Sequence, residues 1–122
     1  MSIEPGDIKI KSVTVMRNLL EPRINPTLAI ILEDIANTFG IMITEGYRPK
    51  RHRDDLHGTT PVRAVDIRSW CYTGNRAEMI CDWINSRWQY DFDRPEKKCC
   101  IFHDVGYGPH MHIQVHPHTM RT

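Results

Sequence analysis

The chain has 122 residues and a formal charge of +1, which suits one domain with a single core. Phosphate binding usually requires a large basic excess, so this balance of charge argues against nucleic acid as the main partner. No apolar stretch approaches the length of a membrane span. The first residues show neither the basic nor the apolar region of a secretory signal. We therefore expect a single domain, residues 1–122, made in the cytoplasm, with neither nucleic acid nor a membrane as its partner.

The first part of the chain predicts an N-terminal arm, one helix and one strand. In residues 1–24 aliphatic residues alternate loosely with polar ones, which indicates a short strand or an extended arm, at Ile8, Ile10, Val13 and Val15. Residues 26–39 predict an amphipathic helix that faces the core, because apolar side chains recur at helical spacing. Asn25 can cap the start of this helix, and Gly40 suits its end. Residues 41–48 then predict a strand.

The second part of the chain predicts a strand, a helix and a hairpin. Residues 62–70 alternate as a strand, and residues 75–88 have the pattern of a second core helix. Residues 99–105 and 111–116 predict two further strands, and the short turn between them favours a hairpin. The expected fold class is therefore α+β, with a small antiparallel sheet and two main helices.

Four cysteines are spread over the second part of the chain, at Cys71, Cys81, Cys99 and Cys100. None has C-x-x-C spacing, and in a reducing cytosol we expect free thiols. Neighbouring residues on a strand point to opposite faces, so Cys99 and Cys100 make a poor chelating pair. A zinc site that uses both of them together with His103 remains an alternative.

Three separated positions carry metal-ligand side chains: His57, Asp66 and the pair His110 and His112. Residues two apart on a strand project from the same face, so both histidines of the pair can reach one site. Two imidazoles and one carboxylate leave tetrahedral zinc an open position for water. Zinc in such a site lowers the pKa of water to about 7 and polarises a carbonyl. The pattern predicts metal-dependent amide hydrolysis, and the alternative is a set of unrelated surface histidines.

Other charged and imidazole residues have simpler interpretations. His116 and His118 follow the last predicted strand and are interpreted as a solvated tail, although His116 continues the alternation of the histidine pair. Glu45 can pair with Arg48 or Lys50. Four basic residues form a local cluster that is either a solvated loop or an attraction for an acidic substrate, namely Arg48, Lys50, Arg51 and Arg53.

Residues 41–116 resemble a known family. The segments that carry the resemblance are Gly46-Tyr47-Arg48, His57, Ala64-Val65-Asp66-Ile67 and His110-Met111-His112-Ile113. They resemble the zinc peptidases of the D-Ala-D-Ala carboxypeptidase group, which share a superfamily with lysostaphin-type enzymes and the hedgehog signalling domain. The resemblance implies a hedgehog/D-Ala-D-Ala peptidase-like fold and Zn²⁺ bound by His57, Asp66 and His112. It also implies that Arg48 polarises the substrate carbonyl or holds its carboxylate, and that His110 assists the reaction beside the metal.

The chain departs from the family pattern at two places. More residues separate His57 from Asp66 than is usual in the family, which enlarges the loop at Thr59-Thr60-Pro61. Many members carry Glu or Asp three residues before the last zinc histidine, where this chain has Pro109. Proline can neither donate nor accept a proton, so His110 is the first candidate for proton transfer, followed by His103 or Asp104.

The resemblance implies a zinc peptidase that cleaves peptidoglycan stem peptides next to D-amino acids, as in phage or prophage lysis and virion enzymes. Such a protein would act on the cell wall after release or as a virion component, as a monomer or within a larger assembly. The alternative is an inactive zinc-stabilised binding or structural module of the same fold. A third interpretation, a nucleic-acid-associated protein that uses the basic cluster, is opposed by the balanced charge.

Overall fold

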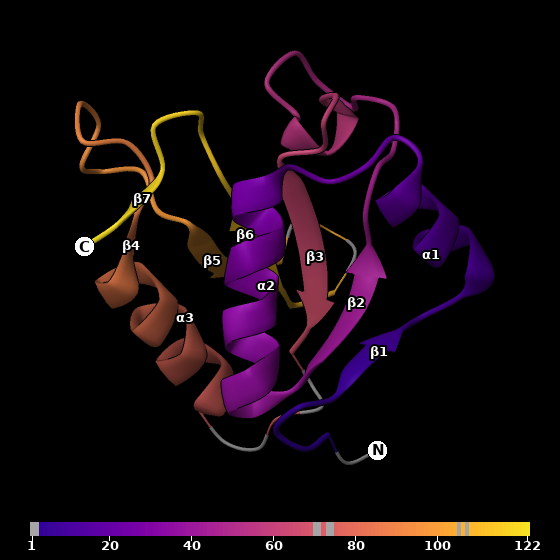
Figure 1. Ribbon diagram of the computed structural model, residues 1–122, viewed down its shortest axis with the longest axis horizontal. Coiled ribbons are helices and arrows are strands. Elements are labelled where there is room, and N and C mark those ends of the chain that lie inside the picture. The colour runs from indigo at the N-terminus through magenta and orange to yellow at the C-terminus, as the bar shows by residue number, and fades with distance from the viewer. Residues whose placement is uncertain (1–2, 70–71, 73–74, 105, 107) are drawn as a thin grey trace.

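The computed structural model describes residues 3–69, 72, 75–104, 106 and 108–122. Within these residues the chain is α+β, with three α-helices, a five-stranded sheet and a two-stranded sheet (Figure 1). The elements in chain order are β1 Ile8–Ile10, α1 Val13–Leu20, α2 Pro26–Phe39, β2 Ile41–Glu45, the 3-10 helix η1 Leu56–Gly58, β3 Ala64–Arg68, α3 Arg76–Arg87, β4 Trp88–Gln89, β5 Cys100–His103, β6 His110–Gln114 and β7 Met120–Arg121.

The main sheet has the strand order β1-β2-β3-β6-β5. Strands β2, β3, β6 and β5 pair in antiparallel fashion, and the predicted hairpin of β5 and β6 is confirmed. Strand β1 differs from the expected antiparallel pattern, because it lies parallel to β2. A parallel pair needs a crossover connection, which α1 and α2 provide.

The N-terminal arm contains a helix that the sequence analysis did not predict. Strand β1 confirms the expected short strand, but Val13 and Val15 lie in α1 rather than in extended chain. The side chain of Ser12 caps this helix by accepting a hydrogen bond from the Val15 N–H at 3.2 Å. The prediction failed because the apolar residues of α1 also fit a loose alternation, and several of them face solvent, as Val13 does at 78% exposure.

Helix α2 follows its predicted bounds because both of its ends have the expected chemistry. The Asn25 side chain accepts hydrogen bonds from the backbone N–H groups of Thr27 and Leu28. At the other end Gly40 has a φ of 77°, and a Cβ there would clash with the Glu4 carbonyl oxygen, so glycine is required. Helices α2 and α3 lie on one side of the main sheet (Figure 1). The apolar face of α2 is buried there at Leu28, Ile31, Leu32, Ile35 and Ala36.

The two faces of the sheet have different side chains because alternate residues point in opposite directions. Val65, Ile67 and Met111 are fully buried in the core. Asp66 and His112 alternate with them and therefore point to the other face, where they line a cavity. The candidate site thus lies on the face of the sheet opposite the core.

The expectation of free cysteines is wrong for two residues. Cys81 of α3 and Cys100 of β5 form a disulfide, because helix and strand pack together and bring the two Cα atoms within 5.2 Å. Cys100 is therefore no ligand for the alternative zinc site with Cys99 and His103. Cys99 is a free, buried thiol, and burial raises its pKa to about 12. Cys71 lies outside the described residues.

The C-terminal end is also more ordered than the predicted solvated tail. Met120–Arg121 form β7, which pairs with β4 at Trp88 and Gln89. The His116 side chain is only 19% exposed, because the segment that follows β6 packs back on the loop after β4. Among the described residues no helix has the length and apolar character needed to cross a membrane.

Candidate metal centre

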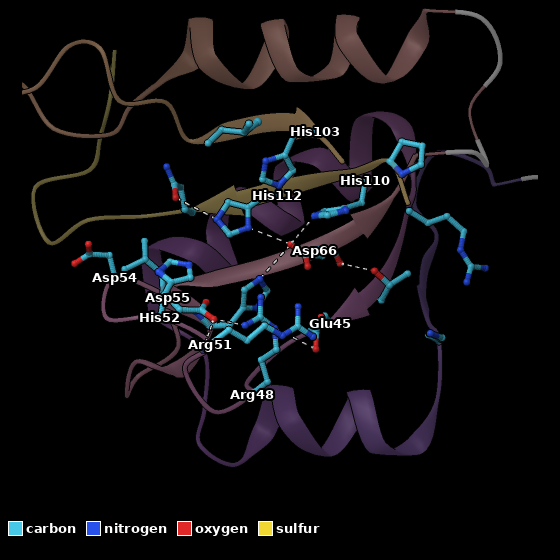
Figure 2. Close-up of a pocket in the computed structure, with 18 residues that line it drawn as sticks. Glu45, Arg48, Arg51, His52, Asp54, Asp55, Asp66, His103, His110 and His112 are labelled. Carbon is cyan, nitrogen blue, oxygen red and sulfur yellow. Dashed lines mark hydrogen bonds and ion pairs between the residues drawn. The ribbon is translucent and has the colours of Figure 1, made fainter. Parts of the chain in front are cut away.

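The structure brings His57, Asp66 and His112 together. One ligand atom from each of these three side chains lies within 4.8 Å of the other two. Asp66 on β3 and His112 on β6 are direct partners in the sheet register. His57 belongs to η1, in the loop that leads to β3. Figure 2 shows Asp66 at the middle of the site, with His110 and His112 directed toward it.

The outer nitrogen of each ligand-type imidazole is bound to a carbonyl oxygen. His57 Nδ1 lies 2.8 Å from the Gly46 carbonyl oxygen and donates to it. His112 Nε2 lies 3.1 Å from Gln114 Oε1. The Gln114 amide nitrogen donates to the Lys98 carbonyl at 2.7 Å, which leaves its oxygen toward His112. Both imidazoles therefore carry their proton on the nitrogen that faces away from Asp66 when they are neutral.

The inner nitrogens then converge on one carboxylate oxygen. Asp66 Oδ1 lies 3.2 Å from His57 Nε2 and 3.1 Å from His112 Nδ1. Two imidazole lone pairs and a carboxylate oxygen at these distances repel one another unless a proton or a metal cation lies between them. Histidines that bind metals usually donate their other N–H to a carbonyl or carboxylate, as both do here. The donor set fits a divalent cation.

Asp66 is buried and ionised. Burial raises its pKa, but the hydrogen bonds that His112 and His57 donate when their inner nitrogens are also protonated outweigh this effect and hold the pKa well below its usual value of 3.8. The side chain is 9% exposed, and that of His57 is 1% exposed. A metal ligand must be deprotonated before it binds, and Asp66 meets this condition throughout the neutral pH range.

Asp55, which the sequence analysis did not single out, holds the loop that carries His57. Its buried carboxylate accepts hydrogen bonds from the backbone N–H of His57 at 3.1 Å and of Arg51 at 3.0 Å. It also accepts a hydrogen bond from Arg48 Nη1. A cap residue two positions before His57 is a recognisable local pattern, so sequence could have identified it.

Arg48 lines the cavity, and its guanidinium group already has two acidic neighbours. Besides its contact with Asp55, its Nε lies 3.3 Å from Glu45 Oε1, which confirms the predicted ion pair. The backbone N–H of Arg48 donates to the His57 carbonyl at 3.2 Å. Arg48 therefore helps to hold the His57 loop as well as facing the cavity.

Two more histidines lie beside the three ligand-type residues. His110 Nδ1 donates to the Gly108 carbonyl at 3.0 Å, and its Nε2 lies 3.7 Å from Asp66 Oδ1. The His103 ring centroid lies 4.8 Å from that of His110 and 5.8 Å from that of His112. Burial lowers the pKa of His103, and the neighbouring His110 and His112 lower it further. Both additional rings are thus placed to exchange protons with a molecule in the cavity.

The cavity around these residues has a volume of about 790 Å³. It is lined mostly by acidic, basic and imidazole side chains of β2, β3, β5 and β6 and of the 51–57 loop, many of which Figure 2 labels. This volume lies within the range of pockets that enclose small ligands. No family model, curated protein or solved structure matches the chain.

Proposed function

We propose that this chain is a zinc-dependent peptidase that hydrolyses peptidoglycan stem-peptide bonds next to D-amino acids. The observation that carries the proposal is the convergence of His57 Nε2 and His112 Nδ1 on Asp66 Oδ1, with the outer nitrogen of each ring held by a carbonyl oxygen. Two imidazoles and one carboxylate are a common ligand set of catalytic zinc. The D-Ala-D-Ala carboxypeptidase group, whose motifs the chain resembles, supplies the substrate class and a hedgehog-like assignment of the fold.

The three ligands would hold Zn²⁺ and leave room for water. A zinc ion bound there would lower the pKa of that water and polarise the scissile carbonyl. Imidazole ligands favour zinc, copper, nickel or iron over magnesium and calcium, which prefer oxygen ligands throughout. Asp66 would supply negative charge to the bound cation, and the two histidines would fix the position of that cation.

His110 is our candidate for proton transfer. With Nδ1 held by the Gly108 carbonyl, its Nε2 faces the site 3.7 Å from Asp66 Oδ1. An imidazole can accept a proton from the attacking water and return it to the leaving amine. Pro109 can do neither. His103, whose ring contacts that of His110, is the next candidate.

Arg48 is our candidate for binding a substrate oxygen. A guanidinium group has five N–H donors, so its contacts with Asp55 and Glu45 leave donors for a scissile carbonyl or a terminal carboxylate. Its planar fork matches a carboxylate in a bidentate way. These two carboxylates hold the fork in one orientation, which reduces the entropy lost when a substrate binds.

The second candidate function is an inactive zinc-stabilised binding or structural module of the same fold. Pro109 favours it, because many members of the resembled family carry an acid at that position. For the active protein we propose a role in phage or prophage lysis, or as a virion component, with the cell wall as target.

The test combines zinc analysis with turnover of purified peptidoglycan. Removal of a ligand in His57→Ala or His112→Ala should lower zinc by one equivalent per chain and abolish release of peptide fragments. His52→Ala is the matched control, because His52 lines the same cavity without belonging to the ligand set. Mass analysis of the fragments identifies the cleaved bond.

Each outcome distinguishes the candidates. Zinc bound by the unaltered protein without turnover would favour the inactive module. Full zinc in His112→Ala, with zinc lost in His110→Ala, would contradict the ligand assignment.

A further inference from the structure

A second group of one carboxylate and two imidazoles lies where the C-terminal segment meets the loop after β4. Asp91, His116 and His118 each offer one ligand atom, and these atoms lie within 4.8 Å of one another. The group shares no residue with the candidate catalytic site. His116 and His118 lie between β6 and β7, and Asp91 follows β4; Figure 1 shows β7 beside β4 near the C-terminus.

The spacing of these side chains suits a metal cation better than a direct hydrogen bond. Asp91 Oδ1 lies 3.6 Å from His118 Nδ1, and Asp91 Oδ2 lies 3.7 Å from His116 Nδ1. Both distances exceed the usual length of an N–H···O hydrogen bond. Two ligand atoms on tetrahedral zinc, each about 2.0 Å from the metal, are separated by about 3.3 Å. A shift of a few tenths of an ångström would therefore bring an Asp91 oxygen to ligand spacing with each histidine nitrogen.

Hydrogen bonds hold residues 116–119 in place and determine which nitrogen of His116 carries a lone pair. The backbone N–H of His118 donates to His116 Nδ1 at 3.1 Å, so this nitrogen carries its lone pair. Thr119 Oγ1 donates to the Tyr90 carbonyl at 2.8 Å and accepts from the His116 N–H at 2.8 Å. These contacts position both histidines over Asp91, whose side chain is 5% exposed.

Other groups compete with a cation at this position. Asp91 already accepts hydrogen bonds from Arg94 Nε and from the Asp93 N–H, each at 3.0 Å. A carboxylate has about four lone-pair positions, so about two remain. Arg63, which donates to the Val115 carbonyl, brings a second positive charge near His116. Repulsion from the two arginines and competition for the His116 lone pair make this a weaker site than the first.

We propose that Asp91, His116 and His118 form a second binding site for a zinc-class divalent cation. Cations that prefer imidazole, such as zinc, copper or nickel, match the two-histidine set. When bound, the ion links the segment after β6 to the loop after β4 and stabilises the small β4–β7 sheet. The site is separate from the peptidase site and does not depend on the proposed activity.

The test is a zinc titration of the full chain after removal of all metal, with bound zinc measured at saturation. The unaltered protein should bind two zinc ions per chain, and His118→Ala should bind one. His118 is half-exposed, so its replacement should leave the fold intact. His57→Ala should also bind one ion, and the double variant none. His52→Ala removes an imidazole that belongs to neither group, so this variant should still bind two zinc ions.

Arg94→Gln is a variant that should strengthen zinc binding at the second site rather than weaken it. Removal of the guanidinium that competes for Asp91 should lower the zinc dissociation constant of the second site in the His57→Ala background. Zinc should also raise the melting temperature of His57→Ala, because a ligand that binds only the folded state stabilises it. The proposal would be overturned if His118→Ala still bound two zinc ions. It would also be overturned if the unaltered protein bound one zinc ion and His57→Ala bound none.

Discussion

Gln114 gives the sharpest test of the candidate metal centre, because it touches His112 without belonging to the ligand set. Its Oε1 accepts the His112 Nε2–H at 3.1 Å, and its amide nitrogen donates to the Lys98 carbonyl at 2.7 Å. Gln114→Leu removes the acceptor. Without this acceptor the His112 proton is no longer held on Nε2. When the proton is on Nδ1 instead, it blocks the nitrogen that faces Asp66.

We expect Gln114→Leu to weaken zinc binding about 10- to 100-fold, the usual effect of losing such a partner of a metal-bound histidine. This corresponds to about 1.4 to 2.7 kcal/mol. The loss of one buried hydrogen bond, about 1 to 3 kcal/mol, has the same size. Gln114→Glu is the matched control, because it also loses the donor to Lys98 but keeps an oxygen for His112. Its zinc affinity should therefore exceed that of Gln114→Leu.

The assay is competition for zinc with a chromophoric chelator near neutral pH. Both variants are measured in the His118→Ala background, so that only the first site contributes. Circular dichroism controls for the fold. Equal affinities for Gln114→Leu and Gln114→Glu would refute the argument that His112 binds through Nδ1 with its proton held on Nε2.

Three further variants test the surrounding residues. His110→Ala should keep zinc and lose turnover by about a hundredfold or more, the range of a general acid–base group; full turnover would move proton transfer to another group. Arg48→Lys should also keep zinc and lower turnover, because lysine lacks the bidentate fork; unchanged turnover would remove Arg48 from substrate binding. Burial raises the pKa of Asp55, but hydrogen bonds from the Arg51 N–H and the Arg48 side chain lower it below its usual 3.8. The charged form therefore stabilises the fold above about pH 4, and this contribution is lost as the pH falls further. Asp55→Asn should lower the free energy of unfolding in urea by about 1 to 3 kcal/mol at neutral pH, with a smaller difference near pH 3; a difference independent of pH would contradict this explanation.

The sequence by itself determined the elements whose signals are local. The cap at Asn25 and the stop at Gly40 define α2, because both act on backbone groups within a few residues. Alternation defined β3, and the short connection defined the β5–β6 hairpin. The same alternation placed His110 and His112 on one face of a strand. These inferences need only neighbours along the chain.

The tertiary structure decided what depends on distant segments. Asp66 and His112 are 46 positions apart, and only the β3–β6 register places them side by side. The parallel position of β1 and the Cys81–Cys100 disulfide also depend on packing between segments, which periodicity does not encode. Asp91 and His118 meet for the same reason, because the chain after β6 folds back on the loop after β4. Local pattern predicts which side chains share a face, but contact between faces is decided by the packing of the whole core.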